Sequence, residues 1–225
     1  MPGDTEILYP VILKAPMENQ ALSGRERVLF LRQYARRAVA LSAERKGLSL
    51  SALQNDPDGR PIPENGVFWS LSHKPEMAAG VAAREPVGID IETVRPVRPG
   101  LMERITDAGE RRLAEPVTEM MFFRFWTAKE AVLKAVGQGL RGLSHCKIHH
   151  IIDEKTLIIS CRQMLWRVEH TFHDHHVVSA ACHQDHPVEW RWIFPEPGQS
   201  IVRHDTLPQA FGGSLKCNSS KKGFS

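Results

Sequence analysis

The sequence has no long apolar run. No stretch approaches the roughly 20 consecutive apolar residues that a membrane-spanning helix needs. The first residues, MPGDTEILYPVILKAP, place acidic residues ahead of a very short apolar stretch. They therefore lack the basic start and long apolar region of a secretory signal peptide. We expect a cytoplasmic protein that has no membrane partner.

Cysteine and net charge are also scarce. The four cysteines are scattered without a C-x-x-C pair, at Cys146, Cys161, Cys182 and Cys217. In a reducing compartment such residues are expected to be free thiols. The net charge of +3 suits an anionic ligand but is too small to favour nucleic acid as a partner.

The first part of the chain predicts one long helix. Its length of 225 residues allows one large domain or two small ones. Ser23 and Glu26 form a capping-box pattern, and Gly47 is a plausible end for the helix. The arginines at positions 25, 32 and 36 recur at helical spacing. They form either a solvated face or a basic stripe for an anionic partner.

Three short strands are predicted after this helix. The turn-rich segment NDPDGRPIPENG, residues 55–66, predicts a loop. Alternating or small apolar residues then predict strands at 67–73, 76–83 and 87–94, and their short connections favour an antiparallel meander. The segment VRPVRPG, residues 94–100, breaks the pattern and is the best candidate for a junction.

The second part repeats the order of helix then strands. We expect helices at about 107–114 and 118–137, and strand-like texture from about residue 147. The predicted organisation is an N-terminal half at 1–98, a C-terminal half at 99–197 and a disordered tail at 198–225. No internal sequence repeat is convincing, so a duplication would have to be ancient.

Two acids on one strand are the first chemical signal. In VGIDIETV, Gly88, Asp90 and Glu92 share one face and the aliphatic residues share the other. Adjacent carboxylates repel, and a divalent cation such as Mg²⁺ removes that conflict. We expect Gly88 to leave room for a bulky ligand. The alternative is a solvated strand face that carries two acids.

The helix at 118–137 offers a third acid. Trp126, Glu130 and Lys134 are spaced four apart and share a helix face. If this helix packs across the third strand, Glu130 becomes a third oxygen ligand and Lys134 lies near whatever the metal holds. Such a group is suited to displacement at phosphorus, where positioning and charge neutralisation dominate.

These blocks carry a resemblance to a known family. VGIDIE, followed about 40 positions later by FWTAKEAVLKAVGQGL, resembles the signature of the 4'-phosphopantetheinyl transferase superfamily. DGRPIP at 58–63 and WSLSHK at 69–74 are similar to two weaker blocks of that family. The resemblance covers about residues 25 to 143 and looks like the two-halved, surfactin-synthetase-activating type.

The resemblance implies an α+β fold with two similar halves related by a pseudo-twofold, with coenzyme A bound in the cleft between them. It implies transfer of the 4'-phosphopantetheine arm of coenzyme A to a serine of an apo carrier protein, releasing 3',5'-ADP, by a monomer. The implied metal ligands for Mg²⁺, with Mn²⁺ as an alternative, are Asp90, Glu92 and Glu130. The implied catalytic residues are Glu130 and Lys134. The implied coenzyme A-binding residues are Arg36, with Arg32 as second choice, Arg60, Ser72, His73, Lys74 and Lys129.

Other interpretations stay open at this point. A metal-dependent phosphodiesterase would cleave a nucleotide diphosphate without a protein acceptor, and a non-enzymatic binding module would not need the acids. Lys74 stands where the family often has a small hydroxyl residue, so it either adds charge near a phosphate or points outward. His173 and His175 could join Cys182 in a zinc site, although a histidine-rich turn fits the spacing better.

Overall fold

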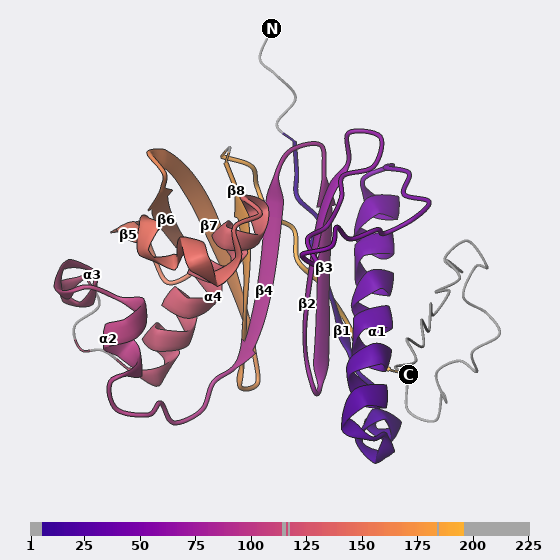
Figure 1. The fold of residues 1–225 in the computed structure, drawn as a ribbon, viewed down its shortest axis with the longest axis horizontal. Helices are drawn as coiled ribbons and strands as arrows, with labels where there is room; N and C mark the ends of the chain where they lie inside the picture. Colours follow the sequence, from indigo (N-terminus) through magenta and orange to yellow (C-terminus); the bar gives the residue numbers. More distant parts are fainter. Residues whose placement is uncertain (1–5, 114–115, 117, 184, 196–225) are drawn as a thin grey trace, which may run out of the picture.

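The fold consists of four layers in the order helix, sheet, sheet, helix (Figure 1). The computed structural model describes residues 6–113, 116, 118–183 and 185–195. This mixture of helices and largely antiparallel sheets confirms the predicted α+β class. The pseudo-twofold between the halves remains a prediction, and the predicted disordered tail at 198–225 lies outside the described residues.

The first sheet has the strand order β2-β3-β1-β9. Its strands are β1 (Val11–Lys14), β2 (Phe68–Lys74), β3 (Met77–Ala83) and β9 (Arg191–Ile193). It is covered by the long helix α1 (Gly24–Arg45), which follows the short 3-10 helix η1 (Met17–Ala21). The capping box of Ser23 and Glu26 is present, and Gly47 has a φ of 66°, so the predicted limits of this helix are confirmed.

The second sheet has the strand order β4-β8-β7-β6-β5. Its strands are β4 (Val87–Thr93), β5 (Cys146–Ile151), β6 (Thr156–Cys161), β7 (Met164–His173) and β8 (His176–Cys182). It is covered by α4 (Glu119–Ala135), which is capped by Thr118. Three short helices complete the fold, namely α2 (Leu101–Ile105), α3 (Ala108–Arg112) and the 3-10 helix η2 (Gly139–His145).

The predicted meander of three strands is wrong at its third member. β2 and β3 pair as an antiparallel hairpin, but β4 leaves them and pairs with β8. The physical reason is that β4 is buried on both sides. Its aliphatic residues, Val87, Ile89 and Ile91, pack against the first sheet, while its other face is covered by α4. A strand that is apolar on one face and in close helix contact on the other belongs in an inner layer.

The sheets exchange strands across the predicted junction. β4 lies before residue 98 but forms an edge of the second sheet, and β9 lies late in the chain but pairs in parallel with β1. Each sheet therefore contains strands from both of the predicted halves, 1–98 and 99–197. The division of the chain between residues 98 and 99 stays a prediction. Of the described residues, no helix is long and apolar enough to cross a membrane.

Candidate active site

The site lies where the edge strands of the two sheets run side by side, β2 from one and β4 from the other (Figure 1). Side chains join these strands. The backbone N–H of Ile89 donates to Ser70 Oγ at 3.1 Å, and Ser72 Oγ donates to Asp90 Oδ1 at 2.7 Å. Lys134 of α4 donates to the carbonyl oxygen of Ile89 at 2.9 Å. Two strands and one helix thus meet around a single carboxylate.

Gly88 allows helix α4 to approach β4 closely. A Cβ atom at Gly88 would lie 1.8 Å from the carbonyl oxygen of Ala131 and 2.9 Å from the backbone nitrogen of Ala135. The space beside Gly88 is therefore filled by the helix backbone, which corrects the expectation that a ligand would enter there. The glycine is needed because any side chain would push α4 away from the acids of β4.

Asp90 is buried and only half satisfied. Its Oδ1 atom accepts from Ser72 Oγ and from Lys134 Nζ, which lies 2.8 Å away. Its Oδ2 atom is buried and has no hydrogen-bond partner among the described residues. A buried carboxylate oxygen is rarely left unpaired, so Oδ2 is suited to receive a cation.

Glu92 is held from two sides. Its Oε1 atom accepts from Trp126 Nε1 at 3.2 Å and from Lys74 Nζ at 2.8 Å. Trp126 and Lys74 come from α4 and β2, so Glu92 also lies at the junction of the layers. Lys74 points toward the acids and not outward, so the outward alternative is wrong, while its place near a phosphate stays a prediction.

Glu130 faces the acids of β4. Burial raises its pKa to about 7, and the neighbouring charge of Asp90 adds to that rise, while Lys134 opposes it. Its Oε1 atom, like Asp90 Oδ2, is buried without a hydrogen-bond partner in the described part of the chain. The predicted packing of this helix across the third strand is confirmed, and the carboxylates of Asp90, Glu92 and Glu130 act on one another.

The acids do not yet form a closed metal cage. Of the residues that the structure describes, no three His, Cys, Asp or Glu side chains are arranged to hold a metal ion. The ammonium groups of Lys134 and Lys74 instead contact Asp90 and Glu92. The donor set nevertheless fits Mg²⁺, because it consists of carboxylate oxygens and two of them are unpaired and buried.

A group of cations lies beside the acids. Arg32 and Arg36 of α1 both donate to Asn55 Oδ1, each at 3.0 Å. The pKa of His73 is lowered first by burial and then by the charges of Lys134, Lys74 and Arg32, so these four residues are neighbours. The pKa of Arg36 is lowered mainly by burial. Such crowding of positive charge favours an anionic ligand.

The loop at 55–66 contributes to the same region. Arg60 pairs with Asp58 at 3.3 Å, and its Cδ atom lies 3.9 Å from where a Cβ of Gly137 would be. The loop therefore reaches the turn that follows α4. Asn55 was not predicted as a site residue, although its place at the start of the turn-rich segment was a usable signal. Only the structure shows that it lies against the arginine stripe.

Two predicted coenzyme A-binding residues have other contacts. The Ser72 hydroxyl donates to Asp90, so it orients a carboxylate. Lys129 is 1% exposed and its Nζ atom contacts Glu110 at 2.6 Å and the carbonyl oxygen of Ile105 at 2.5 Å. Adjacent residues on a helix point about 100° apart. Lys129 therefore points toward α3, while Glu130 points toward β4. The expected binding role of Lys129 is corrected to a structural one.

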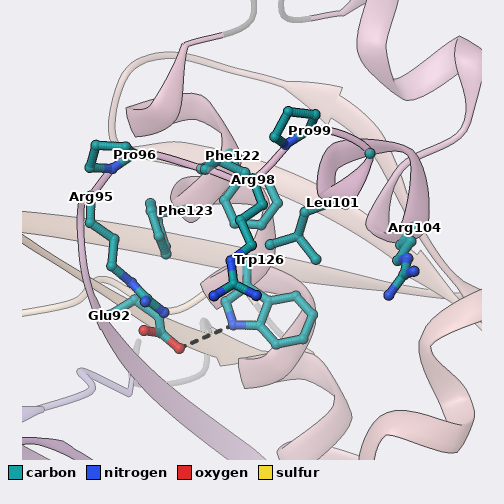
Figure 2. Close-up of a pocket in the computed structure, with 12 residues that line it drawn as sticks. Glu92, Arg95, Pro96, Arg98, Pro99, Leu101, Arg104, Phe122, Phe123 and Trp126 are labelled. Carbon is teal, nitrogen blue, oxygen red and sulfur yellow. Dashed lines mark hydrogen bonds between the residues drawn. The ribbon is translucent and has the colours of Figure 1, made fainter.

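A cavity of about 660 Å³ opens beside Glu92 (Figure 2). Phe122, Phe123 and Trp126 of α4 supply an aromatic wall. The segment from Arg95 to Leu101 and Arg104 of α2 supply the opposite side. The junction segment VRPVRPG therefore borders the cavity next to a predicted metal ligand.

The histidine-rich region does not bring the proposed zinc ligands together. His173 is paired with His176 at one end of the β7–β8 hairpin, whereas Cys182 is opposite Arg167 at its other end. Six residues of strand separate these positions by about 20 Å. Cys146 and Cys161 lie opposite each other on β5 and β6 as free thiols, with their Sγ atoms 2.7 Å apart.

Comparison with known proteins supports one family. Residues 86–194 match the sequence profile of the 4'-phosphopantetheinyl transferase superfamily. The chain is 34% identical over 98 residues to the 4'-phosphopantetheinyl transferase psf-1 of Bacillus pumilus, covering 40% of this chain and 42% of that protein. It is 35% identical over 102 residues to the 4'-phosphopantetheinyl transferase HetI of a Nostoc strain, covering 40% and 43%.

A third relative is the 4'-phosphopantetheinyl transferase gsp of Aneurinibacillus migulanus, 29% identical over 86 residues, or 36% of each chain. The match to these relatives spans less than half of their length. The matched family segment contains β4 with Asp90 and Glu92 and α4 with Glu130 and Lys134. By its matched segment and its relatives, this chain is similar to the 4'-phosphopantetheinyl transferase superfamily over the part that carries the acids.

Proposed function

We propose that this protein transfers the 4'-phosphopantetheine arm of coenzyme A to a serine hydroxyl of an apo carrier protein and releases 3',5'-ADP. The observation that carries the proposal is the meeting of Asp90 and Glu130 across β4 and α4, with a buried unpaired oxygen on each. The neighbouring cations supply the complementary half of a site for a diphosphate.

Asp90, Glu92 and Glu130 would hold Mg²⁺, with Mn²⁺ as the alternative ion. Bound there, the ion would supply charge neutralisation for the diphosphate oxygens. Lys134 and Lys74 are already close to the acids, so their ammonium groups are placed to donate to the same diphosphate. Ser72 and Trp126 keep Asp90 and Glu92 oriented through their hydrogen bonds.

The separate 3'-phosphate of coenzyme A needs its own donors. Arg36, Arg32 and His73 form a connected cationic group that fits this need, with Arg60 at its edge. A guanidinium binds phosphate through two parallel hydrogen bonds and stays charged, so arginine is well suited to this position. Asn55 would hold two of the arginines in place for the ligand.

In the transfer, the serine oxygen of the carrier attacks the phosphorus that bears the pantetheine arm. The bond from that phosphorus to the bridging oxygen breaks, and the bridging oxygen leaves as part of 3',5'-ADP. The serine proton passes to the Glu130 carboxylate, directly or through a water molecule. Lys134 donates to the oxygens on which negative charge grows, which stabilises the transition state.

The cavity beside Glu92 fits the carrier protein as the second substrate. Arg95, Arg98 and Arg104 border it, and the guanidinium groups of all three are without an ion-pair partner in the described chain. An acidic carrier helix with apolar side chains would complement both these arginines and the aromatic wall. A serine held there would lie beside Glu92 and therefore next to the diphosphate.

The test is transfer itself. The protein is mixed with Mg²⁺, coenzyme A and an apo carrier protein, and the carrier is weighed by mass spectrometry for the phosphopantetheine increment. Glu130→Gln and Asp90→Ala should abolish the increment while circular dichroism stays unchanged. Glu119→Gln, an exposed acid on the same helix, is the matched control and should remain active.

Two results would contradict the proposal. Full activity of Glu130→Gln or Asp90→Ala would remove the site assignment. Release of 3',5'-ADP from coenzyme A at the same rate without any carrier would instead indicate a phosphodiesterase. The panel of carriers should include fatty-acid, polyketide and nonribosomal-peptide types, because their surfaces differ and the arginines beside the cavity would discriminate among them.

A further inference from the structure

A buried chain of polar side chains lies under the site. Thr127 Oγ1 of α4 is 2.6 Å from Ser179 Oγ of β8, and Ser179 Oγ is 2.8 Å from His170 Nδ1 of β7. All three residues are at most 1% exposed. A row of polar groups in an otherwise apolar core costs free energy unless the groups are hydrogen-bonded to one another.

Ser179 occupies a special place in the second sheet. It is the register partner of Asp90 on β4 and of His170 on β7, so the three side chains form one row across the sheet. Directly opposite residues point to the same face, which is the face that α4 covers. Ser179 is thus the neighbour of Asp90 that contacts the helix carrying Glu130.

The donors can be assigned from the contacts. The Thr127 hydroxyl donates to the carbonyl oxygen of Phe123 at 2.8 Å. Its single proton is then used, so the Ser179 hydroxyl donates to Thr127 Oγ1, and His170 Nδ1–H donates to Ser179 Oγ. Burial holds the pKa of His170 well below its usual value, which keeps the ring neutral. The chain therefore runs in one direction from β7 to α4.

The apolar contacts of α4 with the sheet do not by themselves fix its position along the strands. Ala128 and Ala131 of the helix are fully buried, and Gly88 and Ala181 lie opposite each other in the sheet. Contacts between such small apolar groups are not directional, and they resist separation more than translation. A hydrogen bond is directional and defined in length. Trp126 and Lys134 make such bonds from α4 to the edge strand β4, and the bond from Ser179 to Thr127 is the one that ties the buried middle of the helix to β8.

We propose that Ser179, held between His170 and Thr127, is a positioning residue that sets where α4 lies on β4 and β8 and thereby fixes the approach of Glu130 to Asp90. Glu130 follows Thr127 by three residues and Lys134 follows it by seven, so all three share the side of α4 near the sheet. This inference rests on the proposed metal site.

The inference also explains the hydroxyl in the WTAKE block. Thr127 is the second residue of that block, and its hydroxyl bonds to Phe123, Arg124 and Ser179 and to none of the expected metal or coenzyme A ligands. Under this proposal its contribution passes through the helix backbone to Glu130. Metal ligands must be placed within a few tenths of an ångström, so a small shift of α4 would weaken the site without unfolding the protein.

The experiment measures binding of Mn²⁺ by electron paramagnetic resonance, with coenzyme A present and no carrier protein. Ser179→Ala and Thr127→Val should raise the dissociation constant for Mn²⁺ by about 10- to 100-fold, the usual effect of losing an outer-shell partner. Thr127→Ser keeps the hydroxyl and should bind like the wild type. Binding of coenzyme A without metal should stay within about twofold for every variant.

The matched control is Ser42→Ala. Ser42 is fully buried and its Oγ accepts from the backbone N–H of Ala82, between α1 and β3. Its removal costs a comparable buried hydrogen bond far from the acids, so urea unfolding should show similar losses for Ser42→Ala and Ser179→Ala. Only Ser179→Ala should lose affinity for Mn²⁺.

Equal Mn²⁺ affinity of Ser179→Ala and Ser42→Ala would overturn the inference. So would a Thr127→Ser variant that binds as weakly as Thr127→Val. In both of these outcomes the wild-type protein still binds Mn²⁺, so the proposed metal site stands and only this inference fails. If the wild-type protein with coenzyme A retained no Mn²⁺, the metal site and this inference would both fall.

Discussion

Gly88→Ala is the sharpest test of how closely α4 lies on β4. The added methyl group would meet the carbonyl oxygen of Ala131 at 1.8 Å and two further backbone atoms below 3.0 Å. Backbone atoms cannot rotate away as a side chain can. The helix must therefore retreat by at least about 1.2 Å, which restores the 3.0 Å below which real Cβ contacts essentially never occur.

This displacement has two expected consequences. Overpacking of a well-packed interior lowers the free energy of unfolding by about 1–3 kcal/mol. Glu130 precedes Ala131 and moves with it, away from Asp90 on the strand. A misplacement of about 1 Å costs roughly 100-fold in rate when a reaction depends on positioning. We therefore expect kcat for the proposed phosphopantetheine transfer to fall about 100-fold and the Mg²⁺ concentration at half-maximal rate to rise.

Two other glycines provide the controls. Gly80→Ala would place a Cβ atom 2.3 Å from the backbone nitrogen of Val39, so it forces α1 away from β3 in the same manner. It should destabilise the protein but leave the Mg²⁺ concentration at half-maximal rate unchanged, since it does not touch α4. Gly24→Ala has nothing within 4 Å of the added atom and should behave like the wild type.

The measurements are urea unfolding and the rate of carrier modification as a function of Mg²⁺ concentration. If the Gly88→Ala variant unfolds at the same urea concentration as the wild type and needs the same Mg²⁺ concentration, the reasoning is refuted. Such a result would mean that α4 can be accommodated farther from β4 at no cost. The convergence of the acids would then not depend on close helix packing.

Three further results are expected. Lys129→Met leaves Glu110 buried without its cation, so the free energy of unfolding measured in urea should fall by about 3–5 kcal/mol. The affinity for coenzyme A measured by calorimetry should stay unchanged, and its loss would refute the structural role of Lys129. Burial lowers the pKa of His170, so the unfolded chain takes up this proton first and stability should be lost as the pH falls below about 6.5. His170→Gln should remove up to about 1.4 kcal/mol per pH unit from the slope measured between pH 6.5 and 5, and an unchanged slope would contradict its burial. Reversal of Arg98 and Arg104 to Glu should raise the half-saturating carrier concentration about tenfold at low salt and leave coenzyme A affinity unchanged; equal carrier binding would exclude this face.

Local patterns in the sequence were enough to predict the helices and strands named above and to single out the candidate acids. The capping box at Ser23 and the positive φ of Gly47 are local signals, so the limits of α1 could be predicted without knowledge of the rest. The alternation of β4 put Asp90 and Glu92 on one face, and helical spacing aligned Glu130 with Lys134. These relations depend only on the periods of strand and helix.

The pairing of elements was decided by the tertiary structure. Whether β4 stays with β3 or crosses to β8 depends on which sheet buries its two faces, and a short connection does not encode that choice. The same holds for Gly88, whose empty side could have faced a ligand and instead faces α4. Long-range packing determines both outcomes.

The sequence by itself determined that three acids and a lysine would be available at fixed positions on one strand and one helix. Only the fold decided that they meet, because that meeting requires the small residues of β4 and α4 to pack face to face. Directions along a single element follow from backbone geometry. Distances between elements follow from side-chain volume and hydrogen bonding across the core.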